Sequence, residues 1–446
     1  MNGAFSAETS FHIEPFHIEP MTNDASETEN RRDVALKLSG RAKLFVVLGS
    51  VVFGLLVCEV ALRVAGYTYP IFYTPDAARG YALRPGAEGW YRKEGRSYVR
   101  INSDGLRDRE HALEKPAATL RIAVVGDSYA EALQVAQEKA FPTILESKLQ
   151  NCAAFGGKKI EVINFGVSGY GTTQELITLR ERVRAYAPDI VLLAFTTNND
   201  VTDNSRSLKR TDEIPYFVPS GDGELVLDNS FRDTRAFRLR DSTPYRAGMW
   251  IRNHLRVIQA IHEGQGAIRN AIKSWRSRGA SDAPDNRKES PAPAQKQAAA
   301  ALADELGIDN LIYREPDDST WTDAWKVTEK LLVLMRDEVR SHGAKFLVVT
   351  LSNGVQVQPD ASAREEFLRR VGATDIFYPD RRIKALGERE NFTVLNLAPA
   401  LQRYAEEHRV FLHGFDKEIG NGHWNELGHA VAGDIIAQSL CEGSAR

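Results

Sequence analysis

Two stretches of the chain hold residues whose types could carry out chemistry. GNGHWNELGH, residues 420 to 429, places two histidines near the C-terminus, and VVGDSYAEAL places Ser128 between an apolar and an amphipathic run. A serine hydroxyl attacks well only when a neighbouring imidazole takes its proton, so a serine and a histidine would together form a nucleophile and its base. Taken alone, Ser128 is more simply interpreted as a helix N-cap.

Two more loops carry polar or flexible residues directly after apolar runs. NFGVSGYGTTQE contains Gly169, and TTNNDVTDN contains Asn198 and Asn199. Each loop alone predicts nothing more than a tight turn. In a parallel sheet, however, ligands bind beyond the carboxyl ends of the strands, where such loops meet.

The order and spacing of the four blocks resemble the SGNH hydrolases, also called the GDSL family, over about residues 121 to 440. That family carries Ser, Gly, Asn and His in this order on a flavodoxin-like sheet. The resemblance implies a serine nucleophile, a histidine base and an oxyanion hole made of two backbone N–H groups and one side-chain amide. The residues that match are Ser128 for the nucleophile and first N–H, Gly169 for the second N–H, Asn199 for the amide and His423 for the base.

This sequence departs from the family pattern near the base. Family members usually carry an Asp two or three residues before the catalytic His, where this chain has Gly420 and Asn421. The groups expected to orient His423 are therefore Asp416, Glu418 or a backbone carbonyl. His429 is expected to dock the last helix instead of reacting.

A second departure is Asn198, which stands where the third block of the family normally has Gly. The two departures together leave open a catalytically inactive binding protein.

Five apolar runs predict the sheet that would position these loops. They are nearly continuous and are separated by stretches with helical periodicity, which is typical of parallel strands covered on both faces. We expect an α/β fold, a flavodoxin-like doubly wound parallel sheet of order 2-1-3-4-5. The runs are RIAVV (121–125), EVINF (161–165), IVLLAFT (190–196), KFLVVTL (345–351) and FTVLNLA (392–398).

The remaining segments divide the chain as follows. Residues 1–43 are predicted to be a disordered cytoplasmic tail, and the chain starts at Met1 or Met21. Residues 67–120 form an irregular leader with a turn at SDG, which packs on the hydrolase domain of residues 121–441. That domain holds an insertion at about 205–325, with a helix in RAGMWIRNHLRVIQAI and a disordered part at about 276–302.

Leu44 to Leu62 is long and apolar enough to cross a bilayer, and we predict a single transmembrane helix over residues 44–64. Basic residues precede it, so the N-terminus is expected in the cytoplasm and the catalytic domain outside the inner membrane, facing the periplasm or exterior. A cleaved signal peptide, a lipoprotein anchored through Cys58 and a buried core helix are the alternatives.

The composition of the chain argues against several classes of binding partner. The net charge of -3 and the pI of about 6.4 offer no basic field for nucleic acid. The three cysteines form no metal-binding cluster, so neither a metal nor a cofactor is expected. In a sheet of order 2-1-3-4-5 the first and last helices lie side by side, and their C-terminal ends meet. An exported domain with this arrangement predicts a Cys152–Cys441 disulfide.

The resemblance implies a membrane-anchored serine esterase that hydrolyses acyl esters, O-acetyl esters on envelope polysaccharide among them, through an acyl-enzyme intermediate. An O-acyltransferase and an inactive envelope carbohydrate-binding protein are the alternatives. The substrate is expected to be an acyl ester or acylated carbohydrate, and the sequence leaves the oligomeric state open. Tryptophan side chains stack on sugars or simply pack in the core; those considered are Trp90, Trp250, Trp321, Trp325 and Trp424.

Overall fold

The computed structural model of the chain describes residues 39–280 and 308–443 and divides it into two units, Met1–Val57 and Cys58–Arg446. The described part of the first unit is mostly helix α1 (Gly40–Val64), whose last residues, from Cys58, belong to the second unit. An 18-residue window of α1 has a mean hydropathy of 2.5, so this helix is long and apolar enough to cross a membrane. Of the predicted disordered tail, residues 1–43, positions 1–38 lie outside the described residues. The prediction is wrong for residues 40–43, which form the first turn of α1.

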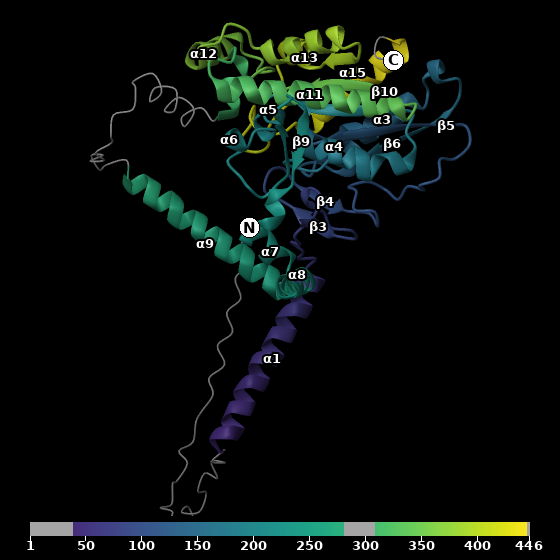
Figure 1. Cartoon of the computed structure of the whole chain (residues 1–446). Coiled ribbons are helices and arrows are strands. Elements are labelled where there is room, and N and C mark those ends of the chain that lie inside the picture. Colours follow the sequence, from purple (N-terminus) through teal and green to yellow (C-terminus); the bar gives the residue numbers. More distant parts are fainter. Residues whose placement is uncertain (1–38, 281–307, 444–446) are drawn as a thin grey trace, which may run out of the picture. The chain divides into compact units, whose positions relative to one another are not determined.

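The second unit is built on the parallel five-stranded sheet that the sequence predicts (Figure 1). Its spatial order is β11-β10-β7-β5-β6, which in chain order is 2-1-3-4-5, and every pairing is parallel. The α/β doubly wound prediction is therefore confirmed. The strands are β5 (Thr119–Gly126), β6 (Lys159–Asn164), β7 (Ile190–Thr196), β10 (Lys345–Leu351) and β11 (Thr393–Asn396).

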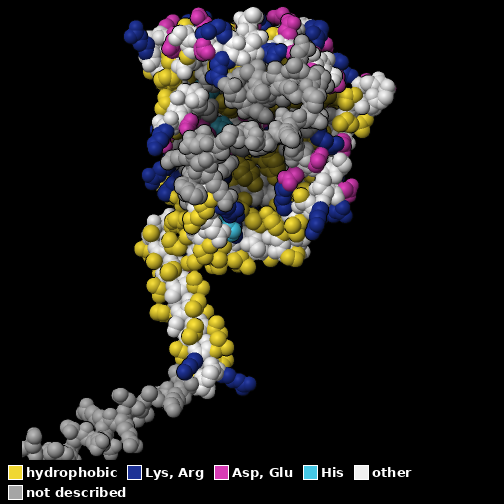
Figure 2. Space-filling view, turned by 90° about the vertical axis from the view of Figure 1, so that its left-hand side faces the viewer, with side chains coloured by type: hydrophobic (Ala, Val, Ile, Leu, Met, Phe, Trp, Pro, Cys, Tyr) yellow, Lys and Arg dark blue, Asp and Glu magenta, His cyan; other side chains and the backbone are white. Residues whose placement is uncertain are grey.

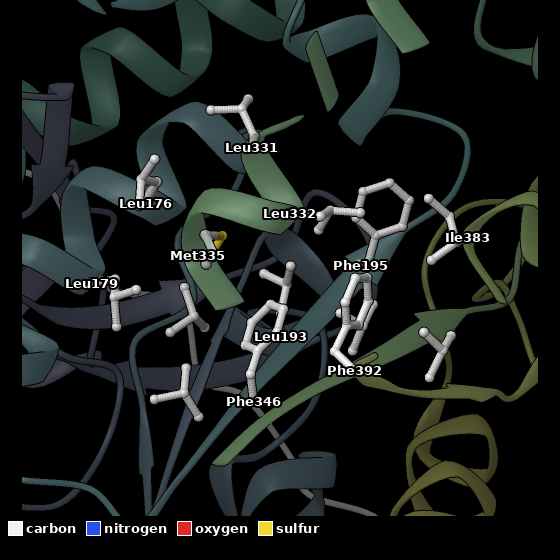
Figure 3. Packing of buried hydrophobic residues seen from close by; sticks show 14 of the residues in the cluster. Leu176, Leu179, Leu193, Phe195, Leu331, Leu332, Met335, Phe346, Ile383 and Phe392 are labelled. Atoms are coloured by element: carbon white, nitrogen blue, oxygen red, sulfur yellow. The ribbon is translucent and has the colours of Figure 1, made fainter. Parts of the chain in front are cut away.

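Helices cover both faces of the sheet because its strands are apolar on both sides. One face packs against α3 (Phe141–Leu149), α14 (Ala398–His408) and α15 (Glu426–Glu442). The other packs against α4 (Thr172–Glu181), α11 (Ser319–Ser341) and α13 (Tyr378–Arg389). Figure 3 shows this second core, in which Met335 of α11 and Leu193 of β7 lie among leucine, isoleucine and phenylalanine side chains.

A disulfide joins Cys152, just past α3, to Cys441 at the end of α15, with 5.7 Å between the Cα atoms. The predicted pairing is confirmed, and it follows from the strand order, which places these two helices side by side. Closing so long a loop stabilises the folded chain by on the order of 5 kcal/mol at most. The third cysteine, Cys58, is free and exposed.

The leader is more regular than expected from the sequence. Two antiparallel hairpins occupy it, β1 (Tyr73–Asp76) with β2 (Gly80–Leu83) and β3 (Glu88–Tyr91) with β4 (Ser97–Arg100). These strands are only four residues long, so their alternation is too short to stand out in the sequence.

The insertion also differs from its prediction. The single helix expected in RAGMWIRNHLRVIQAI is two helices, α8 (Thr243–His254) and α9 (Arg256–Ala280), because Leu255 between them is extended. The predicted disorder at 276–302 is wrong for residues 276–280, which continue α9, and its remainder lies outside the described residues. The insertion also holds α6 (Arg206–Lys209), β8 (Tyr216–Pro219), β9 (Leu225–Asp228), η4 (Ser230–Asp233), α7 (Arg235–Asp241) and η5 (Ile308–Tyr313).

Short elements complete the described chain. They lie in the segments that connect the strands and helices above. They are α2 (Ser128–Glu131), η1 (Gln137–Lys139), η2 (Ala153–Phe155), η3 (Val183–Tyr186), α5 (Asp200–Asp203) and α12 (Ala361–Val371).

Candidate active site

Ser128 is the first residue of α2, directly beyond the carboxyl end of β5. The N-cap of this helix is Asp127, whose Oδ1 accepts a hydrogen bond of 2.9 Å from the backbone N–H of Tyr129. Interpreting Ser128 as the cap is therefore wrong. Because Asp127 takes that role, the Ser128 hydroxyl is left for other partners.

The hydroxyl of Ser128 meets His423, which comes from the loop before α15. The distance from Ser128 Oγ to His423 Nε2 is 2.7 Å. The His423 side chain is 26% exposed, so solvent and substrate reach it. This contact is the geometry that a serine nucleophile and its general base require.

The other ring nitrogen of His423 is held by Glu94. Its Nδ1 lies 2.5 Å from Glu94 Oε2, and its backbone N–H donates to Glu94 Oε1 at 2.7 Å. A carboxylate on Nδ1 fixes the tautomer in which Nε2 can accept the serine proton. The expectation that Asp416, Glu418 or a backbone carbonyl fills this role is wrong.

Glu94 lies in the turn between β3 and β4, so this carboxylate comes from the leader. Gly422, just before His423, makes room for it: a Cβ atom at Gly422 would lie 2.3 Å from Glu94 Oε1. The φ of +75° at Gly422 also favours glycine. The Gly-rich GNGH stretch is the one sequence signal that a distant acid approaches here.

Glu94 is ionised around neutral pH. Partial burial raises the pKa of its carboxyl, but hydrogen bonds from the ring and backbone of His423, and the charge of the protonated ring, together lower the pKa below its ordinary value. An ionised carboxylate stabilises the imidazolium that forms when His423 takes a proton.

A buried polar chain supports the loop that carries His423. Burial lowers the pKa of His413 to about 4, so this ring is neutral. Its Nδ1 lies 2.8 Å from the carbonyl of Gly422, which can only accept, so we assign the ring proton to Nδ1. Its Nε2 then accepts from Ser352 Oγ at 3.1 Å, and Trp424 Nε1 donates to the same hydroxyl at 2.9 Å.

The two other predicted site residues come from the loops after β6 and β7. Gly169 has a φ of +78°, and a Cβ atom there would lie 2.7 Å from the Tyr81 hydroxyl. That hydroxyl donates to the carbonyl of Ser168 at 2.8 Å, which ties the loop to the leader. The Asn199 side-chain amide donates to Asp127 Oδ2 at 2.9 Å, so one of its two N–H groups is oriented by the residue that precedes Ser128.

The side chain of Asp127 is fully buried between these groups. Burial raises its pKa, while hydrogen bonds from Asn199 and from the backbone of Tyr129 oppose that shift. The Asp of the GDS sequence thus both caps α2 and fixes the orientation of the Asn199 amide.

The four predicted residues line a single cavity of about 570 Å³. Its walls come from three regions: the sheet-edge loops, the leader and the insertion. A second cavity, of about 540 Å³, also reaches Ser128, Asn199 and His423. Its other walls are mainly polar, from Asn198, Asp309, Asn310, Asn353, Arg370 and Asn421.

His429 lies apart from this chemistry. It is buried on α15, its ring stacks on Phe141 of α3, and its Nδ1 accepts from the Phe141 backbone N–H at 3.4 Å. Burial and the positive charge of Arg107 lower its pKa to about 3. A ring that stays uncharged around neutral pH in this place docks the last helix.

The five tryptophans have different surroundings, and Trp250 is exposed on α8. Trp321, Trp325 and Trp424 are buried in the core. Trp90 lines the 570 Å³ cavity, with the guanidinium groups of Arg92 and Arg96 over its ring at 5.1 and 5.0 Å. Of the five, Trp90 is therefore the one placed to contact a substrate next to Ser128.

No family model and no curated protein matches the sequence. Solved structures do resemble it, over 71–73% of the chain in the three described next. The acetyl xylan esterase AlAXEase aligns at a TM-score of 0.34 and 11% identity, over 72% of this chain and all of that one. A lipase/acylhydrolase from Enterococcus faecalis aligns at 0.31 and 12%, over 73% and 96%.

A putative lipolytic protein of the G-D-S-L family, the family that the sequence blocks resemble, is from Desulfitobacterium hafniense DCB-2. It aligns at a TM-score of 0.30 and 11% identity, over 71% of this chain and 98% of that one. At such values the similarities carry no inference about the reaction, which has to come from the side-chain geometry.

Proposed function

We propose that the protein is a membrane-anchored serine esterase of the SGNH type that acts through an acyl-enzyme intermediate. The observation that carries this proposal is the continuous relay from Glu94 through His423 to Ser128, with contacts of 2.5 and 2.7 Å, at the wall of a cavity. A complete relay of this kind also argues against an inactive binding protein.

The reaction follows from the relay. His423 Nε2 takes the proton of Ser128 Oγ as this oxygen attacks the ester carbonyl carbon. The backbone N–H groups of Ser128 and Gly169, with the free N–H of the Asn199 amide, stabilise the oxyanion. The imidazolium, held by Glu94, then protonates the leaving alcohol, and water releases the acid by the same steps in reverse roles.

We take the substrate to be an acyl ester of an acylated carbohydrate, with O-acetyl groups on envelope polysaccharide as the first candidate. The sequence resemblance supports this choice, and Trp90 in the cavity wall offers a stacking surface for a sugar ring. Release of acetate from acetylated and chemically deacetylated polysaccharide compares the proposed substrate with its matched control.

The direct test is labelling of Ser128 by a fluorophosphonate probe, together with hydrolysis of a short-chain p-nitrophenyl ester. Ser128→Ala should lose the label and the activity, by on the order of 10⁶-fold in kcat. Ser103→Ala, at an exposed position of the leader, is the control. Wild-type hydrolysis by Ser128→Ala would disprove the assignment of the nucleophile.

Acyl transfer to an alcohol is the second candidate, and the second cavity favours it. Because both cavities reach Ser128 and His423, one can hold the acyl donor while the other holds an acceptor hydroxyl. An added sugar acceptor would then lower the yield of free acid and produce an acylated sugar. Unchanged release of free acid over the whole range of acceptor concentrations would leave hydrolysis as the function.

We further propose that α1 anchors the chain in the inner membrane with the catalytic domain outside the cytoplasm. The basic residues that precede the apolar stretch, among them Arg41 and Lys43, support this orientation. A C-terminal alkaline phosphatase fusion should be active. A C-terminal green fluorescent protein fusion should not fluoresce, because a reporter exported in unfolded form does not mature. The opposite pattern would reverse the orientation.

A further inference from the structure

Helices α8 and α9 of the insertion expose large apolar side chains. On α9, Ile261, Ile268 and Ile272 stand at positions i, i+7 and i+11, so they share one face of the helix. Trp250 of α8 is 62% exposed, and Leu255 between the helices is also exposed. Figure 2 shows hydrophobic side chains gathered at one end of the second unit. Large apolar side chains exposed together in this way mark an interaction surface, and we refer to them as the apolar face of α8 and α9.

This apolar face adjoins the end of helix α1. Arg63 Nη2 donates to the His254 carbonyl at 2.7 Å, and the Val257 N–H donates to Glu59 Oε2 at 3.0 Å. Both contacts lie within the second unit. Since the chain runs without interruption from the apolar residues of α1 into Glu59 and Arg63, a bilayer that holds α1 must end near the junction of α8 and α9.

The charge of these helices suits a lipid surface. Between residues 243 and 272 the chain has four arginines and a single acidic residue, Glu263. Arginines beside an apolar stripe, with an exposed tryptophan, are typical of helices that lie in the headgroup region. Anionic headgroups attract such a helix in addition to the burial of its apolar face.

The same helices form part of the catalytic cavity. Arg252 of α8 and Glu263 of α9 line the 570 Å³ cavity together with Ser128 and His423. Whatever α8 and α9 lie against is therefore next to the mouth of the active site.

We propose that α8 and α9 lie in the headgroup region of the bilayer that α1 crosses, so that the catalytic cavity opens at the membrane surface. The inference rests on the proposed anchoring by α1. The occupant of the apolar face is lipid because the junction of α8 and α9 is hydrogen-bonded to the end of the anchoring helix. The enzyme then takes its ester from molecules that are held at this surface.

Full-length protein in vesicles of neutral and anionic phospholipid tests the proposal. In a Cys58→Ser background, the disulfide leaves no free thiol among the native cysteines. A fluorophore is then attached at Ile261→Cys or Ile268→Cys on α9, at Leu55→Cys in α1, or at Glu365→Cys on α12 as the exposed control. Quenching is measured with lipids that carry a nitroxide near the headgroup or deep in the chain, and with aqueous iodide.

We expect the α9 fluorophores to be quenched most by the shallow nitroxide, the Leu55 fluorophore by the deep one and the Glu365 fluorophore by iodide alone. Ile268→Glu should reduce shallow quenching at position 261 while hydrolysis of a soluble p-nitrophenyl ester is kept. Deep quenching at Leu55 with none at the α9 positions would overturn this proposal and leave the anchor intact. Loss of quenching at Leu55 would instead contradict the proposed anchoring by α1.

Protection of the α9 fluorophores from both iodide and lipid would mean that another protein copy covers this face, which also overturns the proposal. Because each labelled protein is assayed on the soluble ester, failure of the esterase itself is seen separately from failure of membrane contact.

Discussion

The sheet-edge loops and the leader both contribute residues beside His423 and Ser128, but they differ in how those residues are positioned. Ser128 and Asn199 lie within a few residues of the strands β5 and β7, so the strands themselves position them. Glu94 sits at the tip of a hairpin whose two strands, each four residues long, do not belong to the main sheet. The position of Ser128 thus follows from the main sheet, whereas the position of Glu94 depends on how the leader packs against the rest of the second unit.

Glu94→Gln tests the contribution of the leader and has the largest expected effect of the variants below. The variant should lose about 10⁴-fold in kcat, because an amide holds the wrong tautomer of His423 and cannot stabilise its positive form. Ester hydrolysis under saturating substrate measures the loss, and thermal unfolding checks the fold. Glu88→Gln, in the same hairpin and exposed, is the matched control.

Asp416→Asn and Glu418→Gln should remain close to wild type in the same assay. Full activity of Glu94→Gln, with loss in either of these variants, would return the acid to the C-terminal loop. The leader would then be a structural segment alone.

The sheet was predictable because its strands are long apolar runs, and the strand order then placed Cys152 next to Cys441. That Ser128, Gly169, Asn199 and His423 line one cavity was predictable, because each follows a strand or stands in a recognisable sequence block. Glu94 was not, because nothing local in the sequence sets how the leader docks, and any of several acids could reach His423. Gly422 was the available clue, but its meaning depends on knowing which side chain fills the space beside it.

Asn199→Ala tests the contribution of the sheet-edge loops. Removing one oxyanion donor should lower kcat by about 10²- to 10³-fold with little change in KM, because the amide acts on the transition state. Asn151→Ala, at an exposed position past α3, is the control. An equal rise in KM with unchanged kcat would show that Asn199 binds substrate instead.

The buried ring of His429 on α15 makes the stability of the folded chain depend on pH. Its pKa of about 3 is lowered first by burial and then by Arg107 of the leader. The unfolded chain takes up this proton near pH 6.5 and the folded chain does not, so stability falls as the pH drops below about 6.5, by up to about 1.4 kcal/mol per pH unit.

His429→Gln removes this contribution, while the other titrating groups stay the same in both proteins. Denaturant unfolding from about pH 7 to pH 5 should therefore show a total difference of about 2 kcal/mol in pH dependence between the two. Parallel pH profiles would mean that His429 is protonated equally in the folded and unfolded chains.

The smallest expected effect concerns Tyr81, through which the leader supports the sheet-edge loop. Its hydroxyl donates to the Ser168 carbonyl at 2.8 Å, beside Gly169. Tyr81→Phe should cost about 1 kcal/mol of unfolding free energy. It should lower kcat less than Asn199→Ala does, since the Gly169 N–H remains in the site and only the neighbouring hydrogen bond to Ser168 is lost. Tyr98→Phe, at an exposed position of β4, is the matched control. A loss of kcat as large as that of Asn199→Ala, at unchanged stability, would instead place the Tyr81 hydroxyl at the reacting atoms, and the leader would supply two catalytic groups.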